Sequence, residues 1–148
     1  NRNCLQNHSK LDRMKIPNIS CKIEMFCSVN PSEDTTKIQK AISNVFPYST
    51  VKTENSSISF QTNDLKSLEK IYETIHTKQS QKIYRRNLEK NLENDTTWFY
   101  LNKQAAFVEK IAICEKADES PLGPIKVILT SVYIDKIIDW IVSRCDET

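Results

Sequence analysis

Residues 19–29 have the sequence ISCKIEMFCSV, in which apolar and polar side chains alternate. Successive side chains of a β-strand point to opposite faces of a sheet, so this alternation predicts a half-buried strand. The predicted buried face contains Ile19, Cys21, Ile23, Met25, Cys27 and Val29. The opposite face contains Ser20, Lys22, Glu24 and Ser28. The stretch therefore predicts one strand with its apolar face against a core.

The rest of the chain alternates between helical and extended patterns. Asn30-Pro31 ends the first strand, and Ser32 is expected to cap a helix whose apolar residues recur from Ile38 to Val45. The later segments are extended over 51–61 with a turn at 55–57, helical over 65–92 with a break near 79–80, extended over 98–101 and 105–114, extended over 125–132, and helical over 134–142. The segment 105–114 is also compatible with a helix by propensity. The order β-α-β-α-α-β-β-β-α predicts a single α+β domain with a largely antiparallel sheet.

Length and composition exclude several classes of protein. The chain has 148 residues, with 21 Lys and Arg against 19 Asp and Glu. No stretch approaches the length of apolar sequence that spans a membrane. Gly123 is the only glycine, which excludes a P-loop and a dinucleotide-binding fingerprint, because both need several glycines beside phosphate. Residues 1–15 show no periodicity, so we expect a flexible extension there and one domain over 16–148.

Cysteine usage indicates a reducing compartment. The five cysteines are odd in number and form no C-x-x-C pair, which argues against a disulfide framework and against a zinc site. Cys21, Cys27 and Cys114 stand in apolar stretches and are expected to be buried. The sequence therefore predicts a cytoplasmic protein.

The residues available for catalysis are few. His76 is the only histidine within the patterned region, and its spacing from Tyr72 favours a packing or surface role. No metal-ligand spacing occurs, and no cofactor is expected. Glu33 and Asp34 are adjacent carboxylates, but helix capping accounts for them. We therefore expect a protein that is not an enzyme, and hydrolysis of a phosphoester that depends on Glu33 or Asp34 would contradict this.

Basic residues cluster in one predicted helix. Five Lys and Arg side chains lie in residues 76–90 and only Glu89 opposes them. The five are Lys78, Lys82, Arg85, Arg86 and Lys90. Four of them step by four residues with Arg85 alongside, so we expect one continuous ridge on a helix. Like charges at this spacing weaken an isolated helix, which favours an anionic partner. The alternative is an ordinary solvated face.

Aromatic and polar residues adjoin in a second segment. Trp98, Phe99 and Tyr100 precede Asn102, Lys103 and Gln104. Aromatic rings beside such polar groups on a sheet can stack unpaired bases and bond their edges. Alternation places Trp98 and Tyr100 opposite Phe99, so at least one of these faces belongs to the core.

Four segments in this order resemble a small archaeal family whose mostly uncharacterised members are described as predicted RNA-binding or exosome-associated proteins. They are SVNPSEDTTKIQKAISNVFP (28–47), LNKQAAFVEKI (101–111), PLGPIKV (121–127) and IDWI (138–141). The family's Pro-Thr-Glu-Asp motif corresponds to residues 31–34, with Ser32 in place of the usual Thr. Its Leu-Asn-Lys-Gln-Ala-Ala motif is intact at 101–106. The relatives are expected to have a small residue, commonly Gly, near Glu109.

The resemblance spans roughly residues 18–145 and implies a fold like that of ribosomal protein L5, with helices packed on one side of the sheet. It also implies RNA as a partner, within an RNA-processing complex. The leading hypothesis is non-catalytic RNA binding, with residues 78–90 on phosphates and Asn102, Lys103 and Gln104 near bases or sugars. The alternative is a protein–protein adaptor or homodimer that uses apolar residues exposed on the sheet.

Overall fold

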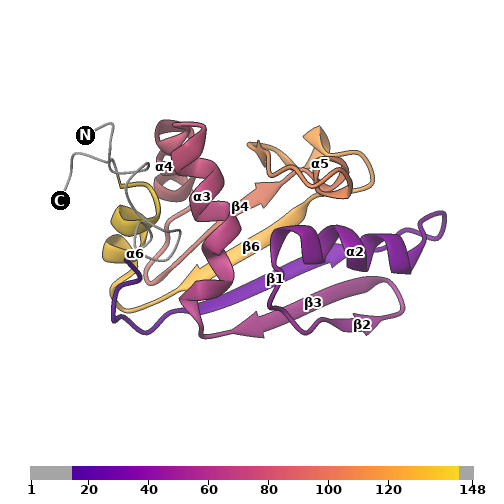
Figure 1. The fold of residues 1–148 in the computed structure, drawn as a ribbon, viewed down its shortest axis with the longest axis horizontal. Helices are drawn as coiled ribbons and strands as arrows, with labels where there is room; N and C mark the ends of the chain where they lie inside the picture. Colours follow the sequence, from indigo (N-terminus) through magenta and orange to yellow (C-terminus); the bar gives the residue numbers. More distant parts are fainter. Residues whose placement is uncertain (1–14, 144–148) are drawn as a thin grey trace.

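Six antiparallel strands form one layer of the structure, and the helices lie together on one face of that sheet (Figure 1). The computed structural model describes residues 15–143. Across the sheet the strands are β2 (Lys52–Glu54), β3 (Ser57–Thr62), β1 (Lys22–Ser28), β6 (Ile125–Thr130), β4 (Thr96–Leu101) and β5 (Ile113–Cys114). The predicted α+β class with a largely antiparallel sheet is confirmed. Of the predicted extension over residues 1–15, all but Lys15 lies outside the described residues.

The helical layer contains five α-helices and two 3₁₀ turns within the described residues. The α-helices are α2 (Thr35–Val45), α3 (Glu69–Thr77), α4 (Gln81–Lys90), α5 (Lys103–Phe107) and α6 (Ile134–Ile141). The 3₁₀ turns are η2 (Leu65–Leu68) and η3 (Ala117–Glu119). No helix within residues 15–143 is long and apolar enough to cross a bilayer.

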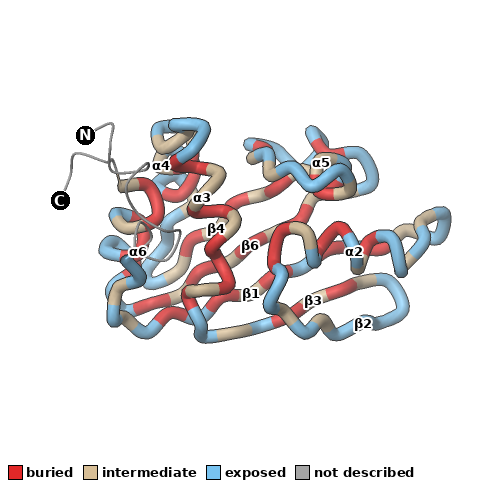
Figure 2. The backbone as a smooth tube through the Cα atoms, in the orientation of Figure 1, coloured by how far each residue is buried: buried red, intermediate tan, exposed pale blue. Residues whose placement is uncertain are grey.

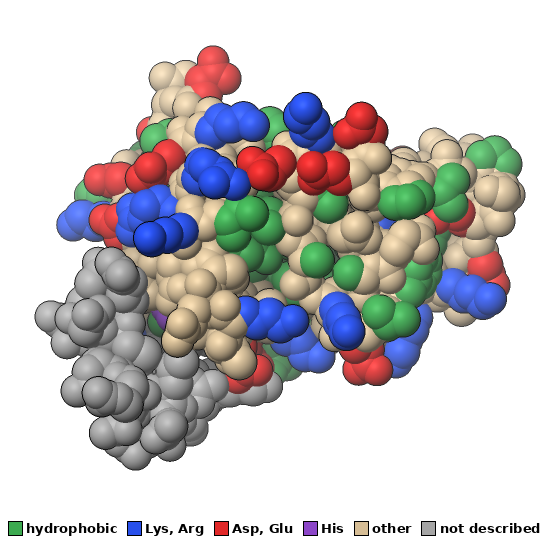
Figure 3. Space-filling view, turned by 90° about the horizontal axis from the view of Figure 1, so that it is seen from above, with side chains coloured by type: hydrophobic (Ala, Val, Ile, Leu, Met, Phe, Trp, Pro, Cys, Tyr) green, Lys and Arg blue, Asp and Glu red, His purple; other side chains and the backbone are tan. Residues whose placement is uncertain are grey.

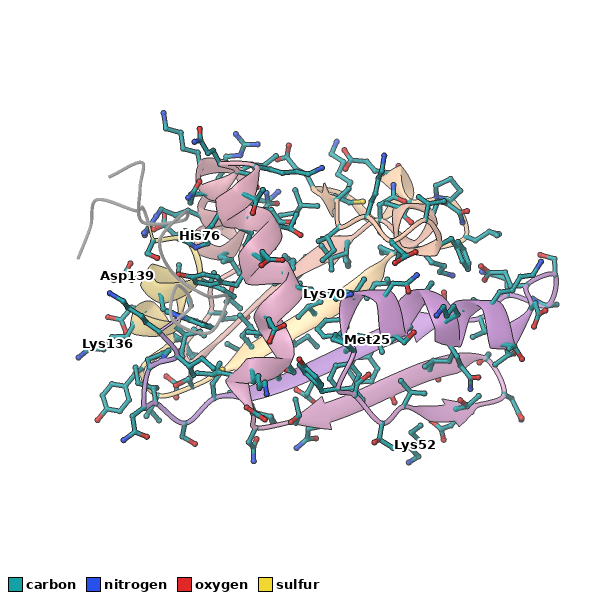
Figure 4. All side chains as sticks on the ribbon, in the orientation of Figure 1. Met25, Lys52, Lys70, His76, Lys136 and Asp139 are labelled. Carbon is teal, nitrogen blue, oxygen red and sulfur yellow. The ribbon has the colours of Figure 1, made fainter. Side chains whose placement is uncertain are left out.

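The core lies between the sheet and the helices. Residues Ile23, Met25 and Cys27 of β1 are buried, and the residues between them are not, as the alternation predicts. Figure 2 shows the same alternation of buried and more exposed positions along the strands, and Figure 4 shows Met25 beneath the helical layer. The helices complete this core with apolar residues such as Ile38 of α2 and Ile137 of α6.

Three cysteines are buried, free thiols, as predicted. Cys21 and Cys27 are each 1% exposed, and Cys114 is also buried. Burial raises the pKa of the Cys21 and Cys27 thiols to about 11. At neutral pH these two side chains therefore remain protonated and pack as small apolar groups.

His76 has a packing role, as predicted. Its ring stacks on Tyr72 with centroids 3.9 Å apart, and its Nε2 lies 3.1 Å from the carbonyl oxygen of Ile141. Figure 4 shows His76 where α3 faces α6. The side chain therefore helps to join these two helices.

The N-cap of α2 differs from the prediction. Asp34, not Ser32, is the capping residue, and its Oδ1 accepts a hydrogen bond from the Thr36 N–H at 2.9 Å. A capping side chain must lie two or three residues before the N–H that it satisfies. Because α2 begins at Thr35, Asp34 meets this condition for Thr36 and Ser32 lies outside the helix.

The predicted strand over 105–114 is wrong for most of its length. Residues 103–107 form α5, and only Ile113 and Cys114 pair with β4. The Asn102 side chain caps the start of α5 by accepting from the Ala105 N–H at 2.9 Å. A helical start fixed by Asn102 therefore overrides the extended pattern of these residues.

The end of α5 explains why a glycine is expected near Glu109. The Lys110 N–H donates to the Ala105 oxygen at 2.9 Å, and the Glu109 N–H donates to the Ala106 oxygen at 3.1 Å. These two bonds form a Schellman motif, which requires a left-handed residue at the position that Glu109 occupies with φ 60°. Glycine adopts this conformation without steric cost.

A residue in the left-handed conformation also produces the predicted break between α3 and α4. Gln79 has φ 53°, and the Ser80 N–H donates to the Ile75 oxygen at 2.9 Å. This left-handed residue turns the chain after α3, so α4 begins a new helix.

Candidate nucleic-acid interface

Lys103 is fully buried rather than exposed beside a sheet. Its Nζ donates to the carbonyl oxygens of Ser28 at 2.9 Å and Leu122 at 2.8 Å, and to Glu33 Oε1 at 3.1 Å. A lysine ammonium has three N–H donors, and these three partners use all of them. Its burial therefore excludes Lys103 from an RNA contact, which corrects the sequence-based expectation.

Glu33 completes this buried cluster. Its Oε1 also accepts from the backbone N–H of Asn30 at 2.9 Å and from Asn30 Nδ2 at 3.0 Å. Burial by itself would raise the pKa of Glu33, but the hydrogen bonds from Asn30 and Lys103 outweigh it, so this pKa lies below its usual value of 4.5. Glu33 is therefore an ionised structural partner of Lys103 at neutral pH.

The neighbours of Lys103 are also engaged in the fold to different degrees. Asn102 is half-buried and caps α5 through its side-chain oxygen. Gln104 is exposed, and its Nε2 lies 3.5 Å from the Pro121 carbonyl oxygen. Of the three adjacent residues predicted to contact RNA, only Gln104 has an exposed side chain.

The basic residues of 78–90 do not form one continuous helical ridge. Lys78 is the C-cap of α3, and the turn at Gln79 separates it from the four cations of α4. Arg85 pairs with Asp139 at 3.1 Å and with Glu89 at 3.4 Å. The predicted ridge is therefore interrupted, because helix α3 ends before α4 begins.

Acidic residues also neutralise part of this surface. Arg86 Nη2 lies 3.1 Å from Glu115 Oε2. Figure 3 looks onto the side where α4 and α5 lie uppermost in Figure 1, and it shows Lys and Arg side chains interspersed with Asp and Glu. Within residues 15–143, Lys78, Lys82 and Lys90 are exposed and form no ion pair. Among the five cations of the predicted ridge, these three are the most available to an external anion.

A second candidate surface is the face of the sheet that the described helices leave uncovered, which we call the open face. One row across it contains the paired neighbours Ser59, Phe26, Lys126 and Tyr100. The next row contains Gln61, Glu24, Ile128 and Trp98. None of these side chains is buried. The open face therefore presents aromatic, basic and amide groups together.

The aromatic residues of the open face are arranged around one lysine. Lys126 Nζ lies 4.6 Å from the centroid of the Trp98 ring, and the Trp98 and Tyr100 rings are 4.8 Å apart. Phe26 is 46% exposed and is the direct neighbour of Lys126 on β1. Phe99 is 1% exposed, which confirms that Trp98 and Tyr100 point away from the core.

Sequence reasoning missed Phe26 and Lys126 as members of this surface. Both occupy positions that strand alternation assigns to the face opposite the core. Phe26 is the one large apolar residue on that face of the 19–29 stretch, and this departure from the pattern was the available signal. The pairing of β1 with β6 decides which side chains lie beside Phe26. No local sequence pattern specifies this pairing.

Helix α4 lies in the helical layer over β4, on the face of the sheet opposite the open face (Figure 1), where Tyr84 packs against the buried Phe99. Asn91, which follows α4, donates from Nδ2 to the Trp98 carbonyl oxygen at 2.9 Å. The residue that follows α4 therefore lies beside the backbone of Trp98. Lys90 therefore lies one residue from the contact that joins the end of α4 to the backbone of β4.

Comparison with known proteins gives one family. Residues 22–131 match the model of a family described as RNA binding. A UPF0201 protein of Sulfurisphaera tokodaii is 36% identical over 127 residues, which cover 83% of this chain and 88% of that protein. A UPF0201 protein of Methanothermobacter thermautotrophicus is 33% identical over 120 residues, covering 81% and 89%.

The solved structures that resemble this chain belong to the same family as these relatives. The crystal structure of a UPF0201 protein from Methanococcus jannaschii is 30% identical and superimposes with a TM-score of 0.71, covering 83% of this chain and 93% of that chain. A second uncharacterised UPF0201 protein has 26% identity and a TM-score of 0.70. The residues of both rows of the open face lie within the matched range 22–131.

Proposed function

The chain belongs to the UPF0201 family, and from this membership we propose that it binds RNA on the open face and α4 without catalysing a reaction. The observation that supports this most directly is the position of Lys126 over Trp98 beside Tyr100, on a face that the described residues leave uncovered. Aromatic rings stack unpaired bases, and a neighbouring ammonium attracts phosphate.

The cations near α4 lie on the helical side of β4, and in this proposal they contact the backbone of an RNA that continues past β4 from the open face. Lys78, Lys82 and Lys90 contact phosphates directly in this proposal. Arg85 and Arg86 exchange their carboxylate partners for phosphate, at little cost because exposed ion pairs contribute only about 0–1 kcal/mol each. The side chains of Trp98, Tyr100 and Lys126 replace Asn102 and Lys103 as the groups near the bases.

The engagement of the two candidate catalytic carboxylates supports a non-catalytic role. The Glu33 side chain is 6% exposed and bound to Lys103, and Asp34 caps α2. Neither carboxylate is available as a general base without loss of these contacts. The family resemblance further supports a place in an RNA-processing complex such as the exosome, which co-purification of the tagged protein with exosome subunits would test.

Fluorescence anisotropy with a labelled single-stranded RNA of mixed sequence tests the proposed function. Base stacking contributes roughly 1–3 kcal/mol per base, so Trp98→Ala is expected to weaken binding about tenfold. Tyr133 with Lys136 provides a matched control, because this exposed pair also has its ammonium over the ring, at 5.8 Å. Tyr133→Ala should leave the affinity unchanged, and an equal loss in both variants would contradict the proposal.

The salt dependence of the same measurement tests the part played by α4. Each phosphate contact to single-stranded nucleic acid contributes roughly 0.7 to the slope of log affinity against log salt. Lys82→Ala combined with Lys90→Ala should therefore reduce this slope by about 1.4. Arg85→Ala with Arg86→Ala should also reduce it. Unchanged slopes in both double variants would show that α4 does not contact the phosphates of the RNA.

Self-association through the open face is a second candidate function. Phe26 is 46% exposed at the centre of this face, and Ile128 adds apolar surface nearby. Strand addition at the sheet edges is a weaker route, because β2 has three exposed residues and β5 has only two residues. Sedimentation equilibrium of the wild type and Phe26→Lys would reveal a dimer that the substitution dissociates.

A further inference from the structure

Helices α2 and α5 form a groove on the helical side of the sheet, which we call the α2–α5 groove. The hollow within it has a volume of about 390 Å³ and is lined by Lys37, Lys40 and Ala41 of α2 and by Phe107 of α5. Figure 1 shows the two helices side by side in the helical layer. The groove therefore lies on the opposite side of the sheet from the open face.

Contacts at both ends of the groove fix the two helices relative to each other. Near the end of α2, Asn44 Nδ2 donates to the Ala106 carbonyl oxygen at 2.9 Å. Near the start of both helices, Lys103 Nζ donates to Glu33 Oε1 at 3.1 Å. A surface that is already fixed in this way loses little conformational freedom when a partner binds, which favours affinity.

Apolar surface on α5 is left accessible beside the hollow. Phe107 packs against the core but is only partly buried. Val108, the C-cap of α5, is 64% exposed. The methylene stems of Lys37 and Lys40 add further apolar lining, because a lysine can bury its stem while its ammonium group remains in water. An apolar side chain of a partner would therefore lose contact with water here, which is favourable.

The charge around the groove is positive. Helix α2 contains two lysines and no Asp or Glu. Lys37 and Lys40 are exposed, and neither forms an ion pair with another described residue. They lie three residues apart on one face, about 4.5 Å along the helix axis. Of the exposed acids directly before and after the two helices, Asp34 caps α2, and the neighbouring Lys110 offsets Glu109.

The lining favours a protein segment over a nucleic acid. The two lysines only donate hydrogen bonds, and the side chains of Ala41 and Phe107 have no polar atom. A base buried in the hollow would leave its N–H donors without an acceptor among these side chains, which is costly. An aliphatic side chain needs no such acceptor. Carboxylates on either side of it in a peptide would complement the two ammonium groups.

We propose that the α2–α5 groove binds an acidic segment of a protein partner, with an apolar side chain in the hollow and carboxylates paired with Lys37 and Lys40. The geometry suits an amphipathic helix laid in a groove, in which apolar anchors recur every three or four residues. This inference does not depend on the proposed RNA binding. Because the open face lies on the other side of the sheet, one molecule can bind RNA and the protein partner together.

Fluorescence anisotropy with a labelled acidic peptide tests this proposal. The probe is a sixteen-residue peptide of Glu and Leu, with Leu at every third or fourth position, and its Kd should lie in the micromolar range. Lys37→Glu combined with Lys40→Glu should weaken binding about tenfold or more, because two attractions become two repulsions. A peptide with Gln in place of Leu should also bind about tenfold more weakly, since it places no apolar side chain in the hollow.

Lys52→Glu combined with Lys136→Glu is the matched control for the change in net charge. Both lysines are exposed and lie on β2 and α6, outside the groove (Figure 4). This variant should bind the acidic peptide as the wild type does. An equal loss in both double variants, equal binding of the Leu and Gln peptides, or displacement of the peptide by single-stranded RNA would overturn the proposal. A Kd for the acidic peptide weaker than about 1 mM would also overturn it.

Discussion

Lys103 Nζ lies 3.1 Å from Glu33 Oε1, and their side chains are 0% and 6% exposed. The pair joins the loop before α2 to the start of α5, and the Leu122 carbonyl brings in the loop before β6. Three of the segments that resemble the archaeal family therefore meet around one ammonium group. At this point the three segments are joined by hydrogen bonds within the fold.

Replacement of Lys103 should destabilise the protein strongly. Lys103→Met leaves the Glu33 carboxylate buried without its cation, and loss of one partner of a buried pair costs about 3–5 kcal/mol. Urea unfolding followed by circular dichroism measures this change. Glu33→Gln added to Lys103→Met removes the uncompensated charge and should recover part of the loss. A loss below about 1 kcal/mol for Lys103→Met would contradict the assigned role.

The pKa of Glu33 predicts a specific loss of stability in acid. Because this pKa is lower in the folded protein than in the unfolded chain, protonation favours the unfolded chain. The ionised Glu33 carboxylate makes its full contribution to the free energy of unfolding above pH 4.5. This contribution is lost as the pH falls through the pKa of the folded protein. The difference in unfolding free energy between wild type and Glu33→Gln should therefore narrow below pH 4.5. A difference independent of pH from 7 to 3 would exclude this linkage.

Gly123 is expected to resist substitution for two reasons. Its φ is +93°, and an added Cβ would lie 2.9 Å from Ser28 Oγ. Gly123→Ala should lower the free energy of unfolding by about 1–3 kcal/mol, the usual range for a strained backbone position. Thermal and urea unfolding measure the loss. Ser28→Ala in the same chain removes the close contact, so it should restore part of the stability while the backbone strain remains.

Glu109→Gly should stabilise the protein. The left-handed conformation costs an L-residue about 1–2 kcal/mol, and glycine avoids this cost at the end of α5. Glycine also loses more conformational entropy on folding, which offsets part of this benefit. We therefore expect the free energy of unfolding to rise by roughly 0.5–1 kcal/mol. Glu109→Ala serves as the control, because alanine removes the charge without the conformational freedom. A gain of equal size in both variants would show that the charge, not the φ angle, is responsible.

Local patterns predicted most elements of the fold. Alternation identified β1, the spacing of apolar residues identified α2 and α6, and the break at Gln79 separated α3 from α4. The errors fell where one side chain decides the outcome. The Asn102 side chain starts α5 within an apolar segment that also fits a strand. The Asp34 side chain, rather than that of Ser32, caps α2 because the helix begins one residue after Asp34.

The candidate site was less accessible to sequence reasoning than the fold. Spacing identified Lys82 and Lys90 correctly as exposed helix residues, but it did not show that Arg85 and Arg86 have acidic partners from α6 and from the loop after β5. Residue type suggested that Lys103 is a surface cation, since lysine is almost never fully buried. The burial of Lys103 is explained by its hydrogen bonds to residues far away in the sequence, such as Ser28 and Glu33.

The sequence by itself determined the strand and helix patterns, and its single glycine excluded glycine-rich phosphate loops. These features follow from backbone geometry, which acts over a few residues. The tertiary structure alone decided that Lys103 meets Glu33 across 70 positions, and that Phe26 and Lys126 share a face with Trp98. Strand pairing and burial set these relationships, because charge and apolar surface find their partners through packing of distant segments rather than through local conformation.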